Sequence, residues 1–146
     1  MPTFTPPQLK KALTEAGFLV FRTQGDDVTL AERVRENLIM DSGVRVRVTD
    51  PLQVRIVLKA QRADFPTEED SRLFELVRKL AEPATRAGFT EVGHAAVPVT
   101  DPSDKAKTLE TFYEVVLSKD AAGLEDALES VRFAMTLEKM VAKPPP

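Results

Sequence analysis

Apolar and polar residues alternate most strictly between residues 44 and 59. Two runs with an apolar residue at every second position flank Asp50-Pro51: Val44, Val46 and Val48 before it, and Val54, Ile56 and Leu58 after it. A period of two is typical of a strand with one buried face, and Asp-Pro is a turn signal. The pattern therefore predicts a β-hairpin that buries these six side chains. We expect Val48 to pair with Val54, which leaves Asp50-Pro51-Leu52 as the loop.

The polar positions of this hairpin carry like charges. In the expected register, Arg47 lies opposite Arg55, and Arg45 lies opposite Val57 with Lys59 nearby. Like charges directly opposed on a sheet destabilise it by about 0.2–1 kcal/mol. We therefore expect a carboxylate within salt-bridge distance of Arg47 or Arg55. The first candidates are Glu110 and Glu114, and the alternative is an external anion, either an acidic partner segment or phosphate.

Helical spacing marks the N-terminal segment. Thr5 is a suitable N-cap, and Pro6-Pro7 suit the first helical positions, where a missing N–H costs nothing. The apolar stripe comprises Leu9, Ala12, Leu13 and Ala16. Gly17 then ends the predicted helix, and residues 18–21 read as a short buried strand.

Residues 28–40 allow two interpretations. Thr29 and Glu32 match a capping box, Leu30, Val34 and Leu38 share one helical face, and Gly43 would end the helix. The alternative is a strand over 28–31 that pairs with 18–21 across a Gly-Asp-Asp turn. We favour the helix over 30–40.

The C-terminal half predicts two helices and two strands. The first helix begins near Pro66 with Thr67 as its cap, buries Leu73, Leu76, Val77 and Leu80, and is broken by Pro83. A short helical continuation ends at Gly88, and residues 89–99 form an edge strand that contains a proline. After a loop at 101–104, a strand over 109–117 turns Leu109, Thr111, Tyr113, Val115 and Leu117 to the core. Asp120 caps a last helix that runs to Val141.

The second half of that last helix carries more than one apolar stripe. Phe133, Leu137 and Met140 are spaced i, i+4, i+7, which places them on one helical face. A helix that is apolar on several sides is buried on several sides. We therefore expect this stripe to form a homodimer interface.

Length and composition limit the class of protein. The 146 residues suit one domain over 1–146, and we expect residues 1–5 and 142–146 to be flexible tails. The net charge of −3 argues against general nucleic-acid binding, which requires a basic surface. No apolar run is long enough to insert into a membrane, and no signal peptide is visible, so a cytoplasmic location is expected.

Few residues suggest catalysis. The chain has no cysteine and one histidine, His94, which is expected to be structural or exposed. The serines lie in no nucleophile-elbow pattern, and the glycines form no phosphate-binding loop. The acidic pair at 26–27 and the acidic triplet at 68–70 lack the spacing of a calcium or magnesium loop. We expect no catalytic residues, no metal site and no cofactor, and therefore a protein that is not an enzyme.

The expected fold class is α+β, mainly an antiparallel sheet flanked by helices. Over residues 6–141 the element order, the small size and the pI near 5.3 are similar to the class I type III secretion chaperones and the YbjN-like domains. Those families place a strand where a helix over 30–40 is favoured here. The resemblance implies a sheet flanked by helices in a protein that is commonly a dimer and binds another protein.

The expected function is therefore that of a non-enzymatic protein-binding module, chaperone-like or an adaptor, which is homodimeric. Its partner is another protein or a second copy of the chain. The candidate partner-binding residues are Arg45, Arg47, Arg55, Phe133, Leu137 and Met140. The alternative is a ligand-sensing or regulatory domain that binds a small anion on the face formed by Arg45, Arg47 and Arg55.

Overall fold

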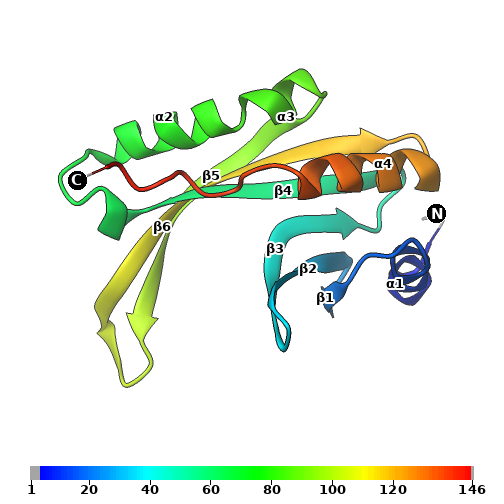
Figure 1. The fold of residues 1–146 in the computed structure, drawn as a ribbon, viewed down its shortest axis with the longest axis horizontal. Coiled ribbons are helices and arrows are strands. Elements are labelled where there is room, and N and C mark those ends of the chain that lie inside the picture. The colour runs from blue at the N-terminus through cyan, green and yellow to red at the C-terminus, as the bar shows by residue number, and fades with distance from the viewer. Residues whose placement is uncertain (1–3, 146) are drawn as a thin grey trace. The chain divides into compact units, whose positions relative to one another are not determined.

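The computed structural model describes residues 4–145 (Figure 1). Its helical elements are α1 (Pro6–Glu15), α2 (Asp70–Leu80), α3 (Glu82–Arg86), α4 (Leu124–Met135) and the 3-10 turn η1 (Arg62–Asp64). Its strands are β1 (Val20–Gln24), β2 (Asp27–Arg35), β3 (Leu38–Arg47), β4 (Leu52–Gln61), β5 (Thr90–Asp101) and β6 (Asp104–Ala121). The strands form one antiparallel sheet in the order β1-β2-β3-β4-β6-β5. The predicted α+β class is confirmed.

The chain packs into two compact units. The first contains the residues up to Ile56 together with Ser118–Leu137, and the second contains Val57–Leu117 together with the residues from Glu138 onward. Strands β4 and β6 contribute residues to both units. Of the expected tails, residues 1–3 and 146 lie outside the described residues, whereas Thr5 caps α1. No helix within residues 4–145 is both long and apolar enough to cross a membrane.

In the first unit, α1 forms as its sequence predicts. The Thr5 hydroxyl accepts a hydrogen bond from the Gln8 backbone N–H at 3.3 Å, and the Gln8 side chain accepts one from the Thr5 N–H at 2.9 Å. Pro6 and Pro7 occupy the first turn, and Leu9 and Leu13 are buried. Gly17 follows with φ 95°, a left-handed conformation that glycine adopts without a Cβ clash.

The helix favoured over 30–40 is wrong, and the alternative strand is present. Leu30 pairs with Val20 across the β1–β2 turn, and β2 then turns back into β3 at Glu36-Asn37. The three residues that suggested a helical face do not share an environment. Leu30 is fully buried, whereas Val34 and Leu38 are 50% and 44% exposed. The helical spacing of these residues was therefore coincidental.

The hairpin of β3 and β4 buries the predicted face but not in the predicted register. The six alternating side chains from Val44 to Leu58 are all buried. Val46, rather than Val48, pairs with Val54. The Val48 amide donates to the carbonyl oxygen of Asp26 in the β1–β2 turn, at 2.8 Å, and so continues the contact of β3 with β2 beyond its last pair with β4. The two-residue shift keeps each side chain on its expected face.

The final helix is shorter than predicted at both ends. Asp120 lies in β6, and α4 begins after Gly123. It ends at Met135 rather than Val141, and the Thr136 hydroxyl donates to the carbonyl oxygen of Phe133 at 2.7 Å. Its buried side chains are Ala127, Leu128, Ser130, Val131 and Ala134. Beyond the helix, Met140 forms a parallel bridge with Lys59 in the second unit.

In the second unit, α2 begins at Asp70 and not near Pro66. The Arg62 guanidinium donates to the carbonyl oxygens of Phe65 and Glu68, which holds the intervening residues as a loop. Thr67 therefore does not cap the helix. Within α2, Leu73 and Val77 are buried, while Leu76 and Leu80 are only half-buried. The predicted break at Pro83 is confirmed, because Pro83 lies in the first turn of the separate helix α3.

Strands β5 and β6 are longer than predicted and form a ribbon that extends away from α2 (Figure 1). At its tip, the Ser103 N–H and hydroxyl both donate to the Asp101 carboxylate, at 2.9 and 2.7 Å. Tyr113, Val115 and Leu117 are buried as predicted. Thr111 is half-buried, and Leu109, predicted to face the core, is 54% exposed.

Candidate functional site

The polar face of the first unit's sheet holds an ordered set of side chains, which we call the arginine face. It comprises Asp27 and Thr29 on β2, Arg45 and Arg47 on β3, and Gln53 and Arg55 on β4. Two rows of paired residues cross these strands: Asp27, Arg47 and Gln53 in one, and Thr29, Arg45 and Arg55 in the other. The alternation of β3 and β4 positions the arginines, because the valines and Ile56 between them point to the core.

Arg47 is neutralised by Asp27. The Arg47 Nε donates to the Asp27 Oδ1 at 2.9 Å, and Nη2 donates to Oδ2 at 3.2 Å. This two-bond geometry matches the planar guanidinium to the carboxylate. The hydrogen bonds from Arg47 lower the pKa of the Asp27 carboxyl, although burial opposes them, and the charges of Arg47, Arg45 and Arg55 lower it further. The same bond raises the pKa of Arg47.

Arg45 and Arg55 are direct cross-strand partners and are both half-buried. The Nε atom of each is buried without a hydrogen-bond partner among the described residues. Arg55 Nη2 donates to the Gln53 side-chain oxygen at 3.2 Å, which contributes no compensating charge. Burial lowers the pKa of Arg55, and the positive charges of Arg47 and Arg45 act in the same direction, while Asp27 opposes them.

These contacts confirm one part of the sequence interpretation and correct two others. A carboxylate does lie within salt-bridge distance of Arg47, as expected. Its source is Asp27 and neither of the first candidates, Glu110 and Glu114. The Glu110 carboxylate accepts hydrogen bonds from the Ala63 N–H at 3.1 and 3.2 Å instead. The residue opposite Arg55 is Arg45 and not Arg47, because of the register shift described above.

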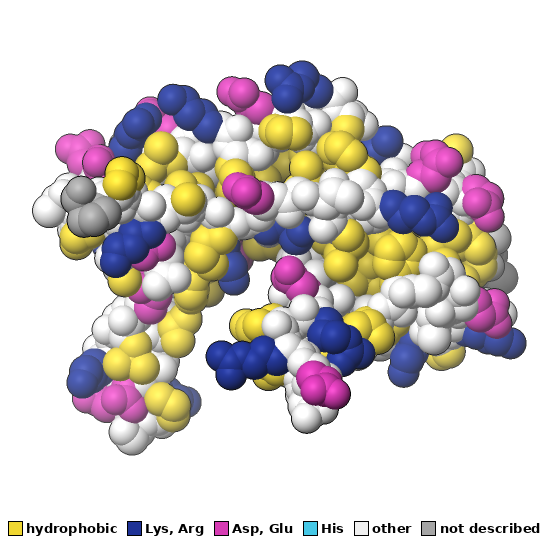
Figure 2. Space-filling model, viewed as in Figure 1, with side chains coloured by type: hydrophobic (Ala, Val, Ile, Leu, Met, Phe, Trp, Pro, Cys, Tyr) yellow, Lys and Arg dark blue, Asp and Glu magenta, His cyan; other side chains and the backbone are white. Residues whose placement is uncertain are grey.

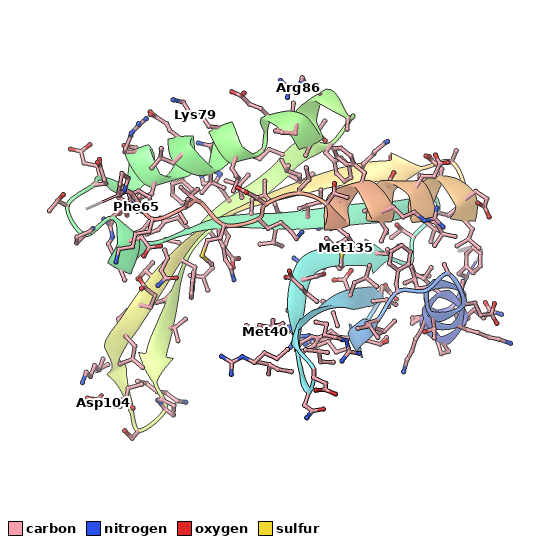
Figure 3. All side chains as sticks on the ribbon, in the orientation of Figure 1. Met40, Phe65, Lys79, Arg86, Asp104 and Met135 are labelled. Atoms are coloured by element: carbon pink, nitrogen blue, oxygen red, sulfur yellow. The ribbon has the colours of Figure 1, made fainter. Side chains whose placement is uncertain are left out.

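A second set of candidate residues lies at the end of the hairpin formed by β2 and β3. Its exposed large apolar side chains are Val34, Leu38, Ile39 and Met40, and we call this surface the hairpin end. Met40 is the most exposed of them at 52% and is labelled on β3 in Figure 3. Ile39 pairs with Arg33, so apolar and basic side chains lie next to each other.

The third set lies on the ribbon of β5 and β6. Its exposed large apolar side chains are Val92, Val97, Val99 and Leu109. Val97 and Val99 are two residues apart and so share one face of β5, while Val92 is on the opposite face. Apolar side chains lie among acidic and basic ones on this ribbon (Figure 2), whose tip is marked by Asp104 in Figure 3. Strand β5 is also an edge of the sheet.

The residues predicted to form a dimerisation stripe do not share a helix. Phe133 lies on α4 and is half-buried, while Leu137 follows the helix and is also half-buried. Met140, 38% exposed, is in the bridge with Lys59. The helical spacing argument is therefore wrong, because α4 ends at Met135 (Figure 3).

His94 lies in a surface cluster of the second unit. Its Nδ1 is 3.6 Å from the Glu91 carboxylate, and its ring packs edge-on against Phe74 at 5.0 Å. Arg78 donates two hydrogen bonds to the same carboxylate, at 2.8 and 3.0 Å, and these bonds lower the pKa of Glu91. No group of three or more potential metal-ligating His, Cys, Asp or Glu side chains occurs among residues 4–145.

A hydrogen-bond network around the buried Tyr113 joins η1, α2 and β6 in the second unit, with Asp70 at its exposed end. The Tyr113 hydroxyl donates to the Asp70 carboxylate at 2.8 Å and accepts from Arg62 Nη2 at 2.8 Å. Tyr113 is 4% exposed, and its ring packs against Phe74. The Tyr113 hydroxyl, the Arg62 guanidinium and the Asp70 carboxylate each have a hydrogen-bond partner within the network, which indicates a structural role.

The sequence interpretation missed Asp27 and the two exposed hairpins. Asp27 was considered only as part of an acidic pair, and its partner Arg47 is 20 residues away in the chain. The edge strand expected over 89–99 carried no prediction of which of its side chains are exposed.

No family model matches this chain, and no curated protein or solved structure matches it either.

Proposed function

We propose that this protein is a non-enzymatic protein-binding module, chaperone-like or an adaptor, that acts as a homodimer. The observation that carries the proposal is the distribution of exposed apolar side chains. Eight of the ten large apolar side chains that are exposed in the described part of the chain belong to the hairpin end or to the β5–β6 ribbon. Exposed large apolar side chains that gather on two hairpins, rather than being scattered singly, are typical of association sites.

The ribbon is the proposed dimer surface. A two-stranded ribbon with both faces in water is only marginally stable, so a covering partner stabilises it. Strand β5 is a sheet edge, and edge strands offer unpaired backbone groups to another strand. The tip carries Asp101 and Asp104 as well as Lys105 and Lys107. When two copies pair in an antiparallel, two-fold arrangement, the acidic residues of one tip face the basic residues of the other. This charge pattern favours a second copy of the chain as the occupant.

Light scattering tests the dimer with a matched pair of variants. The wild type is expected to have the mass of a dimer at high micromolar concentration. The double variant Val97→Lys/Val99→Lys is expected to be a monomer with an unchanged circular dichroism spectrum. Val34→Lys alters a valine in the other unit that is 50% exposed, against 37% and 42% for Val97 and Val99, and is expected to remain a dimer. A monomeric wild type, or a dimer unaffected by the double variant, would refute the ribbon as the dimer surface.

The hairpin end is the proposed surface for a partner protein, specifically an extended apolar segment of a non-native chain. Val34, Leu38, Ile39 and Met40 provide the apolar contact, and a methionine side chain adapts to differently shaped apolar groups. The neighbouring Arg33 donates to the Glu36 carbonyl oxygen at 2.8 Å, which ties its side chain back to the turn beside the apolar residues.

Binding of a permanently unfolded, carboxymethylated protein measures this activity. Fluorescence anisotropy is expected to show saturable binding to the wild type and at least about tenfold weaker binding to Ile39→Lys/Met40→Lys, since two desolvated apolar contacts are lost. Leu19→Lys, which alters a residue that is 40% exposed elsewhere in the first unit, is the control and is expected to bind normally. Equal binding by both variants, or none by the wild type, would contradict the chaperone-like activity.

A further inference from the structure

The arginine face holds more positive charge than the described structure compensates. Three guanidinium groups, those of Arg45, Arg47 and Arg55, face the single carboxylate of Asp27. Arginine does not lose its proton in a folded protein, so these positive charges persist at any accessible pH. The set therefore has a formal charge of +2, although the whole chain has a net charge of −3.

The two arginines outside the Asp27 ion pair are also the two with unpaired donors. Arg45 and Arg55 are opposed on adjacent strands, half-buried, and each has a buried Nε with no partner in residues 4–145. A buried donor without a partner costs about 1–3 kcal/mol, and more when it is charged. The groups that act on Arg55 are Arg47, Arg45 and Asp27, so no second carboxylate in this set offsets the repulsion.

From this arrangement we infer that the arginine face binds a small oxyanion with two negative charges, of the phosphate class, between Arg45 and Arg55. A tetrahedral dianion supplies the missing charge and several acceptor oxygens for donors on both strands. The guanidinium forks suit bidentate contacts with phosphate oxygens. The Thr29 side chain lies in the same row of the sheet, so its hydroxyl is placed to take part.

Asp27 has a positioning role in this proposal. It binds Arg47 through two hydrogen bonds and so leaves Arg45 and Arg55 as the anion-binding pair. Its negative charge also disfavours an anion beside Arg47, which lies in the neighbouring row. Gln53 accepts a bond from Arg55 Nη2 and thereby fixes the orientation of that guanidinium.

Nuclear magnetic resonance of the arginine Nε–Hε groups tests the site directly. Titration with inorganic phosphate, at constant ionic strength against chloride, is expected to shift the Arg45 and Arg55 signals saturably. The exposed Arg35 signal is the internal control and is expected not to shift. A small phosphate monoester, added in a second arm, distinguishes a ligand with an organic group from free phosphate by its tighter binding. No saturable shift in either arm, or equal shifts at Arg35, would overturn the inference.

Variants confirm the assignment and exclude other sources of the anion. Arg55→Gln is expected to weaken phosphate binding at least about tenfold, since a charged hydrogen bond is lost, whereas Arg35→Gln leaves it unchanged. An acidic, unphosphorylated peptide is the third arm. If the peptide alone shifts Arg45 and Arg55, the ligand is a protein carboxylate and the inference of a small dianion is wrong. This result would leave the proposed dimer untouched, because the ribbon is a separate surface.

Discussion

Asp27 and Arg47 face each other across β2 and β3 and are joined by two hydrogen bonds between carboxylate and guanidinium. The side chains are 19% and 35% exposed, respectively. The pair is therefore partly desolvated, and its carboxylate is the one that the three arginines of the arginine face share. Removal of that carboxylate leaves three neighbouring arginines of like charge with no carboxylate in the arginine face.

We expect Asp27→Asn to destabilise the fold by about 1–2 kcal/mol, the range for a charged hydrogen-bonded pair that is partly exposed to solvent. Asp26→Asn is the matched control, because the neighbouring carboxylate is exposed and forms no salt bridge within residues 4–145. We expect its cost to be within about 0.5 kcal/mol, as is usual for surface substitutions. Urea unfolding measures both, and equal costs would contradict the assigned role of Asp27.

The stability that Asp27 contributes depends on pH in a defined direction. Hydrogen bonds from Arg47 lower the pKa of this carboxyl below its ordinary value of 3.8, and Arg45 and Arg55 act in the same sense. A lowered folded pKa means that the contribution is complete above the unfolded value and is lost as the pH falls through the folded one. The difference in unfolding free energy between the wild type and Asp27→Asn should be constant between about pH 7 and 5 and shrink below about pH 4. A difference that grows in acid would contradict the assignment.

The Tyr113 network is expected to stabilise the second unit. Tyr113→Phe removes the hydroxyl that accepts from Arg62 and donates to Asp70, and it should cost about 1–2 kcal/mol. Asp70→Asn completes a double-mutant cycle, for which we expect a coupling of at least about 0.5 kcal/mol. Additive effects of the two substitutions would show that the residues act independently.

Two isoleucines on neighbouring strands test which part of the sheet is core. Ile56 on β4 is fully buried, whereas Ile39 on β3 is 40% exposed. We expect Ile56→Ala to cost about 2–5 kcal/mol, because it leaves a cavity. Ile39→Ala should cost about 0.5 kcal/mol or less, as for other exposed positions. Thermal or urea unfolding distinguishes them, and similar losses at both positions would contradict the exposure of the hairpin end.

The sequence was enough to predict which face of each strand of the β3–β4 hairpin is buried, but not which residues pair across the strands. Alternation alone places Val44 and Val46 in the core and Arg45 on the opposite side, because the side-chain period of a strand is two. The register is a different matter, because a shift of two residues keeps every side chain on its face, so alternation fits the pairing of Val54 with Val48 as well as the observed pairing with Val46. The ion pair of Asp27 with Arg47 depends on the pairing of β2 with β3.

The predicted boundaries of helices were wrong where the spacing of apolar residues matched a helical pattern by coincidence. Leu30, Val34 and Leu38 fit one helical face, but the tertiary structure buries only Leu30. Phe133 and Leu137 have helical spacing, but the chain leaves the helix at Met135 and residues 139–141 form backbone hydrogen bonds with Lys59 instead. Long-range backbone pairing determined both outcomes, and a single sequence shows no direct sign of it.

The rate of cysteine alkylation on the ribbon tests the proposed homodimer most directly. The chain has no native cysteine, so Val99→Cys introduces one thiol in the proposed interface and Val34→Cys introduces one in the other unit. We predict that alkylation at position 99 slows several-fold as the protein concentration rises from nanomolar to high micromolar, while the rate at position 34 stays constant. Equal, concentration-independent rates at the two positions would contradict the homodimer.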